Sequence, residues 1–397
     1  MSSNIGPEAQ AAYQKYLDAG SIDEKIKRLE EFLSLIPKHK ATENIVALNK
    51  SRLAKLRKEQ EERRIRSRTT SKIVSPFSIK KEGTQLILIS DYYVPGVGKT
   101  SLLNYLTHAA KDKIGKFTAI PEIGIYEYDK IRFQIVDMPS LMEDASTGVG
   151  NGKEILSQLR SCDLICICVD LSRDYNKQMS LILTELTRAS IRLNIEPPPI
   201  TIDKTGANKI QVFYLTREAK KIPNIDELTE NIKKVVFENG IRNAVVKLYG
   251  KVSISDVVDA LDPSVVYKKA IILGTKGDLP ATEDHFESLK EEYSNRFKVI
   301  IGTSTKKKEF PDDFGEIILA LLEKIRIYTM HAGEVADKPL IMDKGVLVKD
   351  VALKIHRSFY DLFDYAIVIR KGVKQKRKRV GLDYGLKDND IIEIHII

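Results

Sequence analysis

Lys99 and Thr100 are the residues whose types and surroundings point most directly to chemistry. They follow Gly98, stand after an apolar stretch at residues 85–89, and begin a run whose apolar residues have helical spacing. A phosphate-binding loop needs this context, because its backbone N–H groups and the N-terminus of the next helix converge on phosphate oxygens. In such a loop the lysine reaches the β- and γ-phosphates and the following hydroxyl binds Mg²⁺. The sequence therefore predicts that both side chains bind a nucleotide and its metal ion and act in catalysis.

The rest of this loop is expected to contribute mainly backbone N–H groups. We assign nucleotide contacts to Gly96, Val97, Gly98, Lys99, Thr100 and Ser101. Counted back from Lys99, the first glycine of the motif is replaced by Tyr93. Glycine lets the chain turn there at little steric cost, so a tyrosine either strains the loop or lies against the nucleotide. The alternative interpretation is a helix start of the same sequence that binds no ligand.

Short apolar runs that alternate with helical patterns must position this loop. They lie at residues 85–89, 132–136, 164–169, 270–273 and 299–301. Strands that alternate with helices predict an α/β fold, with a mostly parallel sheet covered by helices on both faces.

The three cysteines of the chain fall within one of these apolar runs. Cys166 and Cys168 share one face of the predicted strand, and Cys162 precedes it. A buried strand is a poor place for thiolates to converge on a metal ion. We therefore expect these cysteines to be small core residues and not metal ligands or disulfide partners.

The flanking regions predict further parts. Residues 7–68 have helical spacing, broken at Pro37, and predict a helical hairpin with a long basic second helix. Additional strand and helix patterns interrupt the alternation at residues 191–262, and a small mixed sheet with a helix is expected after residue 332. The predicted parts are a helical region (1–80), the core (81–190 and 263–331), an inserted α+β subdomain (191–262) and a C-terminal domain (332–397).

Composition is that of an ordinary globular chain, with 43% hydrophobic and 30% charged residues. No window reaches the roughly 20 uninterrupted apolar residues of a membrane span, and residues 1–11 lack the charged-then-apolar order of a signal peptide. We therefore expect a cytoplasmic protein with no membrane contact.

The formal net charge of +9 is concentrated in two runs, at residues 50–68 and 371–379. Two basic runs that flank a nucleotide-binding core favour contact with RNA phosphates, which would make binding dependent on salt. The alternative is that both runs are solvated faces that keep the chain soluble.

Several segments share their type and order with a known family. His-Lys-Ala-Thr-Glu at 39–43 and Ser-Arg-Leu-Ala-Lys-Leu-Arg at 51–57 resemble its N-terminal helical region. Ile-Arg-Leu-Asn at 191–194, followed by two prolines at 197–198, resembles the start of its inserted subdomain. The tail from about residue 338 resembles a TGS domain, which has a ubiquitin-like sheet. The chain thus resembles, over nearly its whole length, the developmentally regulated GTP-binding (Drg) branch of the Obg-related P-loop GTPases.

This resemblance implies a second nucleotide motif at residues 136–141, Val-Asp-Met-Pro-Ser-Leu. Asp137 would hold Mg²⁺ through water and act in catalysis. Ser140 stands where the family has a glycine whose N–H contacts the γ-phosphate, and a serine keeps that N–H. Leu141 stands where small GTPases carry a water-orienting glutamine, and a hydrophobic residue there is typical of the Obg relatives.

The first switch of the family is similar to residues 117–124, which are one residue shorter than the family pattern. Its Mg²⁺-binding threonine aligns with Ala119, so Thr118 is the only nearby hydroxyl and the expected metal ligand. Loss of that ligand would weaken the ordering of the switch by the γ-phosphate.

The base-binding motif Asn-Lys-x-Asp corresponds to Thr275-Lys276-Gly-Asp278. A carboxylate at Asp278 can accept both N–H groups on the edge of guanine, and the stem of Lys276 can cover the ring. Thr275 replaces only part of what asparagine offers. Ser304 and Thr305 follow the next strand and resemble the loop that completes the base pocket.

Two functions remain open at this stage. The first is a slow Mg²⁺-dependent GTPase that binds GTP and GDP and acts on the ribosome or its RNA. The resemblance implies Mg²⁺, a stably bound partner protein and, as often in the family, a monovalent cation such as K⁺. We expect the chain itself to be a monomer. The second is a non-hydrolysing adaptor that docks to ribosomal RNA, which the substitutions at Tyr93, Ala119, Ser140 and Thr275 would suit. An ATP-dependent enzyme is disfavoured by Asp278.

Overall fold

The computed structural model describes residues 6–19, 22–37, 42–70, 75–93, 96–109, 118–205, 209–370 and 377–397. These residues form two compact units, Met1–Ser78 and Ile79–Ile397. Within the described ranges, no helix combines the length and apolar character needed to cross a lipid bilayer.

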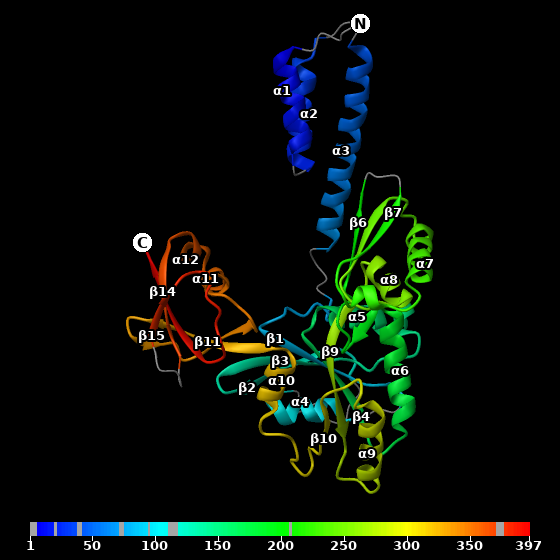
Figure 1. Ribbon diagram of the computed structural model, residues 1–397, viewed down its shortest axis with the longest axis vertical. Helices are drawn as coiled ribbons and strands as arrows, with labels where there is room; N and C mark the ends of the chain where they lie inside the picture. Colours follow the sequence, from blue (N-terminus) through cyan, green and yellow to red (C-terminus); the bar gives the residue numbers. More distant parts are fainter. Residues whose placement is uncertain are drawn as a thin grey trace. The chain divides into compact units, whose positions relative to one another are not determined.

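The first unit is helical, as the sequence predicts (Figure 1). It consists of α1 (Pro7–Asp18), α2 (Ile22–Leu35) and α3 (Glu43–Thr70). Leu29 and Phe32 of α2 are buried against small residues of α1 and against the first half of α3. From α3, Ile45, Val46, Leu53 and Leu56 pack against this core at helical spacing.

The second unit is built on a largely parallel sheet, which confirms the predicted α/β class. Among the described strands of this sheet, only the pair formed by Glu122–Tyr128 and Ile131–Asp137, at one edge, is antiparallel. In spatial order the described strands are β10 (Ile300–Gly302), β9 (Val266–Thr275), β4 (Leu164–Asp170), β1 (Thr84–Ile89), β3 (Ile131–Asp137) and β2 (Glu122–Tyr128), with β5 (Ile191–Leu193) beside β9.

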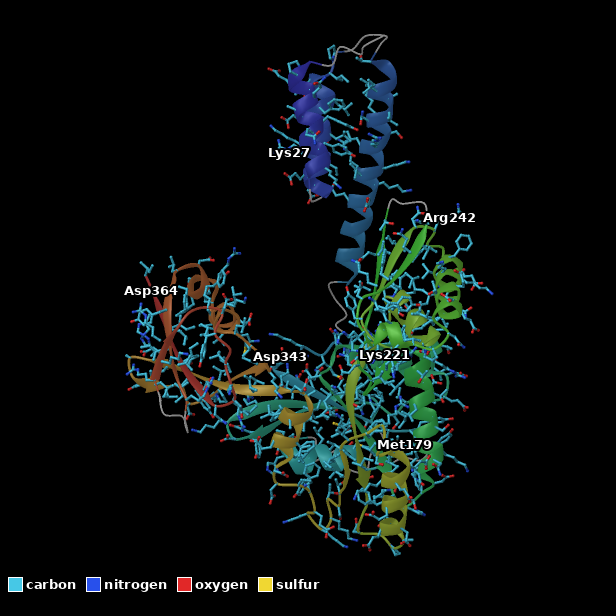
Figure 2. The ribbon with its side chains drawn as sticks, in the orientation of Figure 1. Lys27, Met179, Lys221, Arg242, Asp343 and Asp364 are labelled. Atoms are coloured by element: carbon cyan, nitrogen blue, oxygen red, sulfur yellow. The ribbon has the colours of Figure 1, made fainter. Side chains whose placement is uncertain are left out.

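Helices cover both faces of this sheet. On one face, α4 (Lys99–Thr107) and α10 (Phe314–Leu321) share a core with alternate residues of the central strands. On the other face, α6 (Tyr175–Arg188) contacts β4 and buries Met179 (Figure 2). Two further helices, α5 (Gly152–Ser161) and α9 (Thr282–Tyr293), complete the layers together with the short 3₁₀ turns Ala145–Thr147 and Val149–Asn151.

The cysteines lie in this core, as expected. All three are buried, and Cys166 and Cys168 lie on β4. Burial raises the pKa of the Cys162 thiol to about 12 and also raises the pKa of Cys168 to about 12. Thiols of this kind stay protonated and act as small hydrophobic side chains.

The insertion after β5 folds around a separate small core. Its sheet has the order β6 (Ile200–Lys204), β8 (Ala244–Leu248), β7 (Ile210–Tyr214). The helices α7 (Ile225–Glu238) and α8 (Ile254–Leu261) bury their apolar sides against it, with a 3₁₀ turn at Ala219–Lys221. The sequence patterns at residues 210–215, 225–238 and 244–249 predict a strand, a helix and a strand, which correspond to β7, α7 and β8. Strand β6 and helix α8 are found only in the structure.

A third sheet ends the described part of the chain. Its described strands are β12 (Glu334–Val335), β11 (Lys324–His331), β16 (Asp390–Ile396), β14 (Phe363–Ile369) and β15 (Arg377–Val380), with β13 (Leu340–Asp343) paired to β11. The helices α11 (Val348–Ile355) and α12 (Arg357–Asp361) pack against this sheet (Figure 1). Strand β11 begins ahead of the boundary at residue 332 that the sequence analysis predicts for this domain.

Arg326 of β11 joins the terminal sheet to the core. Its guanidinium pairs with Glu316 of α10 and lies 2.6 Å from the carboxylate of Asp388, in the segment before β16. Burial would raise the pKa of Asp388, but its hydrogen bonds from Arg326 outweigh this and hold the pKa below its ordinary value. The folded protein therefore gains stability from this pair above the ordinary aspartate range and loses it as the pH falls through the lowered pKa.

We expect Arg326→Ala to lower the free energy of unfolding by about 1–2 kcal/mol at neutral pH, since it removes charge-assisted hydrogen bonds from partly exposed carboxylates. The deficit should shrink as the pH falls from about 4 through the lowered pKa of Asp388, because below that pKa the aspartate is protonated in both states. Urea unfolding at several pH values measures this. As a control, Arg357→Ala removes only an exposed pair with Asp361 and should change stability by less than about 0.5 kcal/mol. A deficit that stays constant with pH would contradict the assignment.

Candidate functional site

The loop between β1 and α4 has the backbone conformation of a phosphate-binding loop at its end. Gly96 and Gly98 have φ values of +84° and +111°, which side-chain-bearing residues rarely adopt. Gly98 precedes the first helical residue, Lys99, and no side chain caps the helix. The first N–H groups of α4 are thus available to an anion, with the helix dipole in the favourable direction.

The side chain of Lys99 is buried among hydroxyl groups. Its ammonium donates to Ser90 Oγ at 2.7 Å and to Ser140 Oγ at 3.1 Å. Ser90 is fully buried at the end of β1. Neutral hydroxyls are weaker partners for an ammonium than ionised oxygens, so phosphate oxygens can replace them in this contact.

Three oxygen-bearing side chains converge beside this lysine. Thr100 Oγ1 donates to Asp137 Oδ2 at 2.5 Å, and Thr118 Oγ1 lies 3.2 Å from Thr100 Oγ1 and 3.3 Å from the same carboxylate oxygen. The other oxygen, Asp137 Oδ1, is buried and has no hydrogen-bond partner among the described residues. An unpartnered carboxylate oxygen beside two hydroxyls suits a hard cation, so these residues fit Mg²⁺.

Burial also raises the pKa of Asp137, although Lys99 and the two threonine hydroxyls act in the opposite direction. The carboxylate therefore destabilises the folded protein as long as no cation neutralises it.

The positions of Thr118 and Ala119 bear on the shortened first switch. Ala119 is exposed, whereas the Thr118 hydroxyl lies within the oxygen cluster. Thr118 thus occupies the place that the sequence analysis gives it, and the substitution at position 119 leaves the cluster with a hydroxyl. Phe117 and residues 110–116 lie outside the described ranges.

The second motif follows β3 directly. The N–H of Leu141 donates to the carbonyl of Ser90 at 2.8 Å, which holds this segment against the end of β1. The side chain of Leu141 is fully buried and cannot orient a water molecule. Ser140 Oγ contacts both Ser90 Oγ, at 3.1 Å, and Lys99. The serine therefore adds a contact to the lysine, besides keeping its backbone N–H.

Thr275 links the two ends of the site. Its hydroxyl lies 2.5 Å from the carbonyl of Val97 in the phosphate loop and 3.1 Å from the carbonyl of Val169 in β4. The side chain is buried and lies in van der Waals contact range of a Cβ built on Gly98. Thr275 thus ties the phosphate loop to the strand that carries the base motif, which a shorter polar side chain can do as well as an amide.

The remaining base-motif residues lie at the same edge of the sheet. Asp278 accepts a hydrogen bond from Ser304 Oγ at 3.0 Å, and the neighbouring Thr305 follows in the same loop. The N–H of Gly277 donates to the carbonyl of Thr303 at 3.0 Å, which fixes the two loops to each other. The sequence analysis pairs these two loops, and the structure brings them together.

A buried ion-pair network behind the site is not evident from motif patterns. Lys276 Nζ lies 2.7 Å from Asp170 Oδ2, and Arg173 pairs with both Asp170, at 3.0 Å, and Asp91, at 3.4 Å. Burial would raise the pKa of Asp170, but hydrogen bonds from Lys276 and from Ser172 outweigh this effect, so the pKa lies below its ordinary value. Polar residues directly after buried parallel strands are the one feature of the sequence that could have identified Asp91 and Asp170.

Comparison with known proteins relates this site to described families. The family described as "50S ribosome-binding GTPase" matches residues 94–198, and the family described as "TGS domain" matches residues 325–396. An uncharacterized GTP-binding protein of Methanocaldococcus jannaschii is 34% identical over 390 residues, which cover 96% of this chain and 94% of that protein.

Two eukaryotic relatives are similar over comparable lengths. Developmentally-regulated GTP-binding protein 1 of Xenopus laevis is 27% identical, covering 93% of this chain and 98% of that protein. Ribosome-interacting GTPase 1 of Saccharomyces cerevisiae is 28% identical, covering 94% and 98%. The alignments thus extend well beyond the nucleotide loops in each case.

We expect Asp137→Asn to stabilise the nucleotide-free protein at neutral pH by about 1–2 kcal/mol, because it removes a buried charge that has no full partner. Because the pKa is raised in the folded state, the wild type should lose stability as the pH rises from the ordinary aspartate value through the raised one. The variant should lack this loss. It should also lack any stabilisation by Mg²⁺.

Thermal unfolding from acid to neutral pH, with and without Mg²⁺, measures both effects. Asp312→Asn, at an exposed site, is the control and should behave as the wild type. A variant that is less stable than the wild type at neutral pH without Mg²⁺ would contradict the electrostatic account.

Proposed function

We propose, from the premise that this chain belongs to the developmentally regulated GTP-binding (Drg) proteins with a C-terminal TGS domain, that it is a GTPase of low intrinsic rate acting on the ribosome. GTP binding itself is the property of the family. The observation that carries the enzymatic part is the cluster of Lys99, Thr100, Thr118 and Asp137 beside a helix N-terminus. Positioning and charge neutralisation are most of what phosphoryl transfer requires.

Different residues would bind the phosphates and the metal ion. Backbone N–H groups of residues 96–101 would surround the phosphates, and Lys99 would exchange its serine contacts for β- and γ-phosphate oxygens. Thr100 would bind Mg²⁺ directly, Asp137 would hold it through water, and Thr118 would complete the oxygen set when the first switch closes. Bound there, Mg²⁺ would neutralise charge that develops between the β- and γ-phosphates.

Selectivity for guanine would come from the residues of the base-binding loops. Asp278 can accept the two N–H groups on the edge of guanine, which adenine does not present together. Ser304 already fixes the orientation of this carboxylate, so little ordering is needed on binding. The stem of Lys276, held at its end by Asp170, can cover the base plane. Thr275 would transmit the position of the base loop to the phosphate loop.

Slow turnover is supported by two features. Leu141 is buried where a side chain could otherwise orient the attacking water. Arg173 is held by Asp91 and Asp170 and does not serve as a free cation for the transition state. Removing such stabilisation typically costs orders of magnitude in rate, so a partner or the ribosome would have to supply it.

The second candidate is a non-hydrolysing adaptor, and the buried Leu141 is the observation that favours it. It shares the guanine-nucleotide site but predicts no phosphate release with or without ribosomes. Measured release of phosphate from GTP in the presence of ribosomes separates the two functions.

The location of the protein, its oligomeric state, its partner protein and its activating ion are also proposals. We propose a cytoplasmic location because the name of the yeast relative and the description of the matching GTPase family support action on the ribosome. We further propose that it acts as a monomer, binds a partner protein and is activated by K⁺. Co-sedimentation with ribosomes, sedimentation analysis of the free chain, and hydrolysis in KCl against NaCl test these points.

Lys99→Ala should abolish GTP and GDP binding, with a loss of at least about 100-fold in affinity, because it leaves phosphate charge without its ammonium partner. Binding of labelled GTP, GDP and ATP with Mg²⁺ measures this, and the wild type should prefer both guanine nucleotides to ATP. Lys234→Ala, on the exposed side of α7, is the control and should bind normally. Equal affinity for ATP and GTP would contradict the assignment of Asp278 as the residue that selects guanine.

Thr118→Ala should weaken binding of Mg²⁺·GTP by about tenfold and leave GDP binding nearly unchanged, because this hydroxyl, which already lies beside Asp137, would become a ligand of Mg²⁺ only when the γ-phosphate is bound. Titration of both nucleotides in Mg²⁺ gives the ratio of affinities. Thr118→Ser retains the hydroxyl and should restore the preference for GTP. An equal loss for GTP and GDP in the alanine variant would show a structural role instead.

A further inference from the structure

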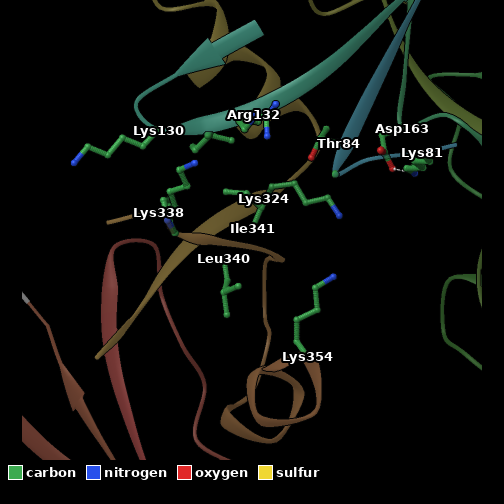
Figure 3. A pocket seen from close by; sticks show the side chains of 13 residues that line it. Lys81, Thr84, Lys130, Arg132, Asp163, Lys324, Lys338, Leu340, Ile341 and Lys354 are labelled. Atoms are coloured by element: carbon green, nitrogen blue, oxygen red, sulfur yellow. Dashed lines mark hydrogen bonds and ion pairs between the residues drawn. The ribbon is translucent and has the colours of Figure 1, made fainter. Parts of the chain in front are cut away.

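A cavity of about 590 Å³ lies within the second unit, between the nucleotide-binding core and the terminal sheet (Figure 3). Side chains from both parts line it. The cationic members are Lys81, Lys130 and Arg132 from the core, and Lys324, Lys338 and Lys354 from the terminal domain. None of these residues belongs to the nucleotide loops or to the two basic runs of the sequence.

The charges of this cavity are only partly balanced. Asp163, the one acidic residue of its lining, pairs with Lys81 at 2.7 Å. Lys324 pairs with Asp343, and Lys130 pairs with Asp337, but both carboxylates are largely exposed to water. No carboxylate within the described ranges lies at ion-pair distance from the other three cations, which are Arg132, Lys338 and Lys354.

Folded backbone holds these cations in place. The turn between β2 and β3 has positive φ at Asp129 and Lys130, +46° and +64°, which is the backbone of a tight hairpin turn. On the other side, Ile341 of β13 packs against the hydrophobic core that includes Ile131. Lys338 precedes β13, and Lys354 lies on α11 (Figure 3). The backbone therefore keeps all six cations around one cavity, and their summed positive potential favours an anion there.

The chemistry of the cations suits phosphate. Five of the six are lysines, which bind phosphate groups as compact point charges without a fixed geometry. Leu340 and Ile341 add apolar surface on the same wall, against which a ribose or base could lie. The cavity is also large enough for more than a single phosphate group.

We propose that this cavity binds consecutive phosphates of an RNA backbone and that the bound strand joins the core to the TGS domain. The site is separate from the nucleotide loops, so the proposal holds whether or not GTP is hydrolysed. Ribosomal contact through the basic helix or tail would also be a different surface. Binding should be salt-dependent and show little preference for sequence.

The test uses the full chain without nucleotide and a short fluorescein-labelled oligouridylate. Lys338→Glu/Lys354→Glu removes two unpaired cations and adds two carboxylates. Loss of two contacts on a single strand should by itself account for about 1.4 in the slope of log K against log salt, which is about 25-fold in affinity at about 0.1 M relative to about 1 M salt, so the double variant should lose at least this much. Lys344→Glu/Lys387→Glu makes the same change in net charge with two exposed lysines of the same domain that do not line the cavity.

A selective loss in the cavity variant, with the control close to the wild type, is the expected result. The milder Lys338→Gln/Lys354→Gln should weaken binding in the same direction, and unchanged thermal unfolding and GTP binding in each variant would show an intact fold. Equal losses in the cavity and control variants would mean diffuse attraction and would overturn the proposal.

Two competitors distinguish other ligands. If the cavity variant loses affinity for inorganic tripolyphosphate but binds the oligouridylate as the wild type does, the site takes small phosphates and the RNA proposal is wrong. If oligoglutamate competes as well as RNA of equal charge, the site recognises acidic peptide and the proposal is likewise wrong. Competition by tripolyphosphate that is weaker than by RNA supports it.

Discussion

The parallel pairing of β1 with both β3 and β4 is the constraint from which the nucleotide site follows. In this register Leu88 lies beside Asp137, and Ile89 lies beside Ile167 of β4. The carboxyl ends of neighbouring parallel strands then meet at one edge of the sheet, and the polar loops that follow them converge there. Every residue of β1 is buried, so a shift of register would place apolar side chains in contact with water.

The substitutions in the nucleotide motifs become intelligible from this arrangement. Thr275 keeps a hydrogen bond to the phosphate loop, Thr118 keeps a hydroxyl in the oxygen cluster, and Ser140 adds a contact to Lys99. Each replacement preserves a polar atom at the place where the neighbouring groups need one. Leu141 is not one of these departures, because a hydrophobic residue is typical of the Obg relatives at this position, and its side chain is buried. The polar contacts around the phosphate loop and the oxygen cluster are therefore retained despite the substitutions.

Positive charge is used in two ways along this chain. In the basic runs it is local: Arg377, Lys378 and Arg379 lie exposed on β15, and residues 371–376 lie outside the described ranges. In the cavity beside the terminal sheet, six cations widely separated in sequence lie together. Arg326 stabilises this arrangement, because it pairs with Glu316 of α10 and with Asp388 in the segment before β16. The same contacts that join the TGS domain to the core thus also assemble the cavity.

The sequence by itself determined the α/β class, the phosphate loop, the base loops and the TGS domain. These depend on local patterns: an apolar run such as β1 is buried on both faces, and Gly98 permits a backbone that other residues avoid. Strand β2 has mixed burial and gave no such pattern. Only the tertiary structure decided that Ser90 contacts Lys99, that Arg173 joins Asp91 to Asp170, and that the scattered lysines share a cavity. Such contacts depend on strand order and register, and a linear pattern carries no information about which distant residues will become neighbours.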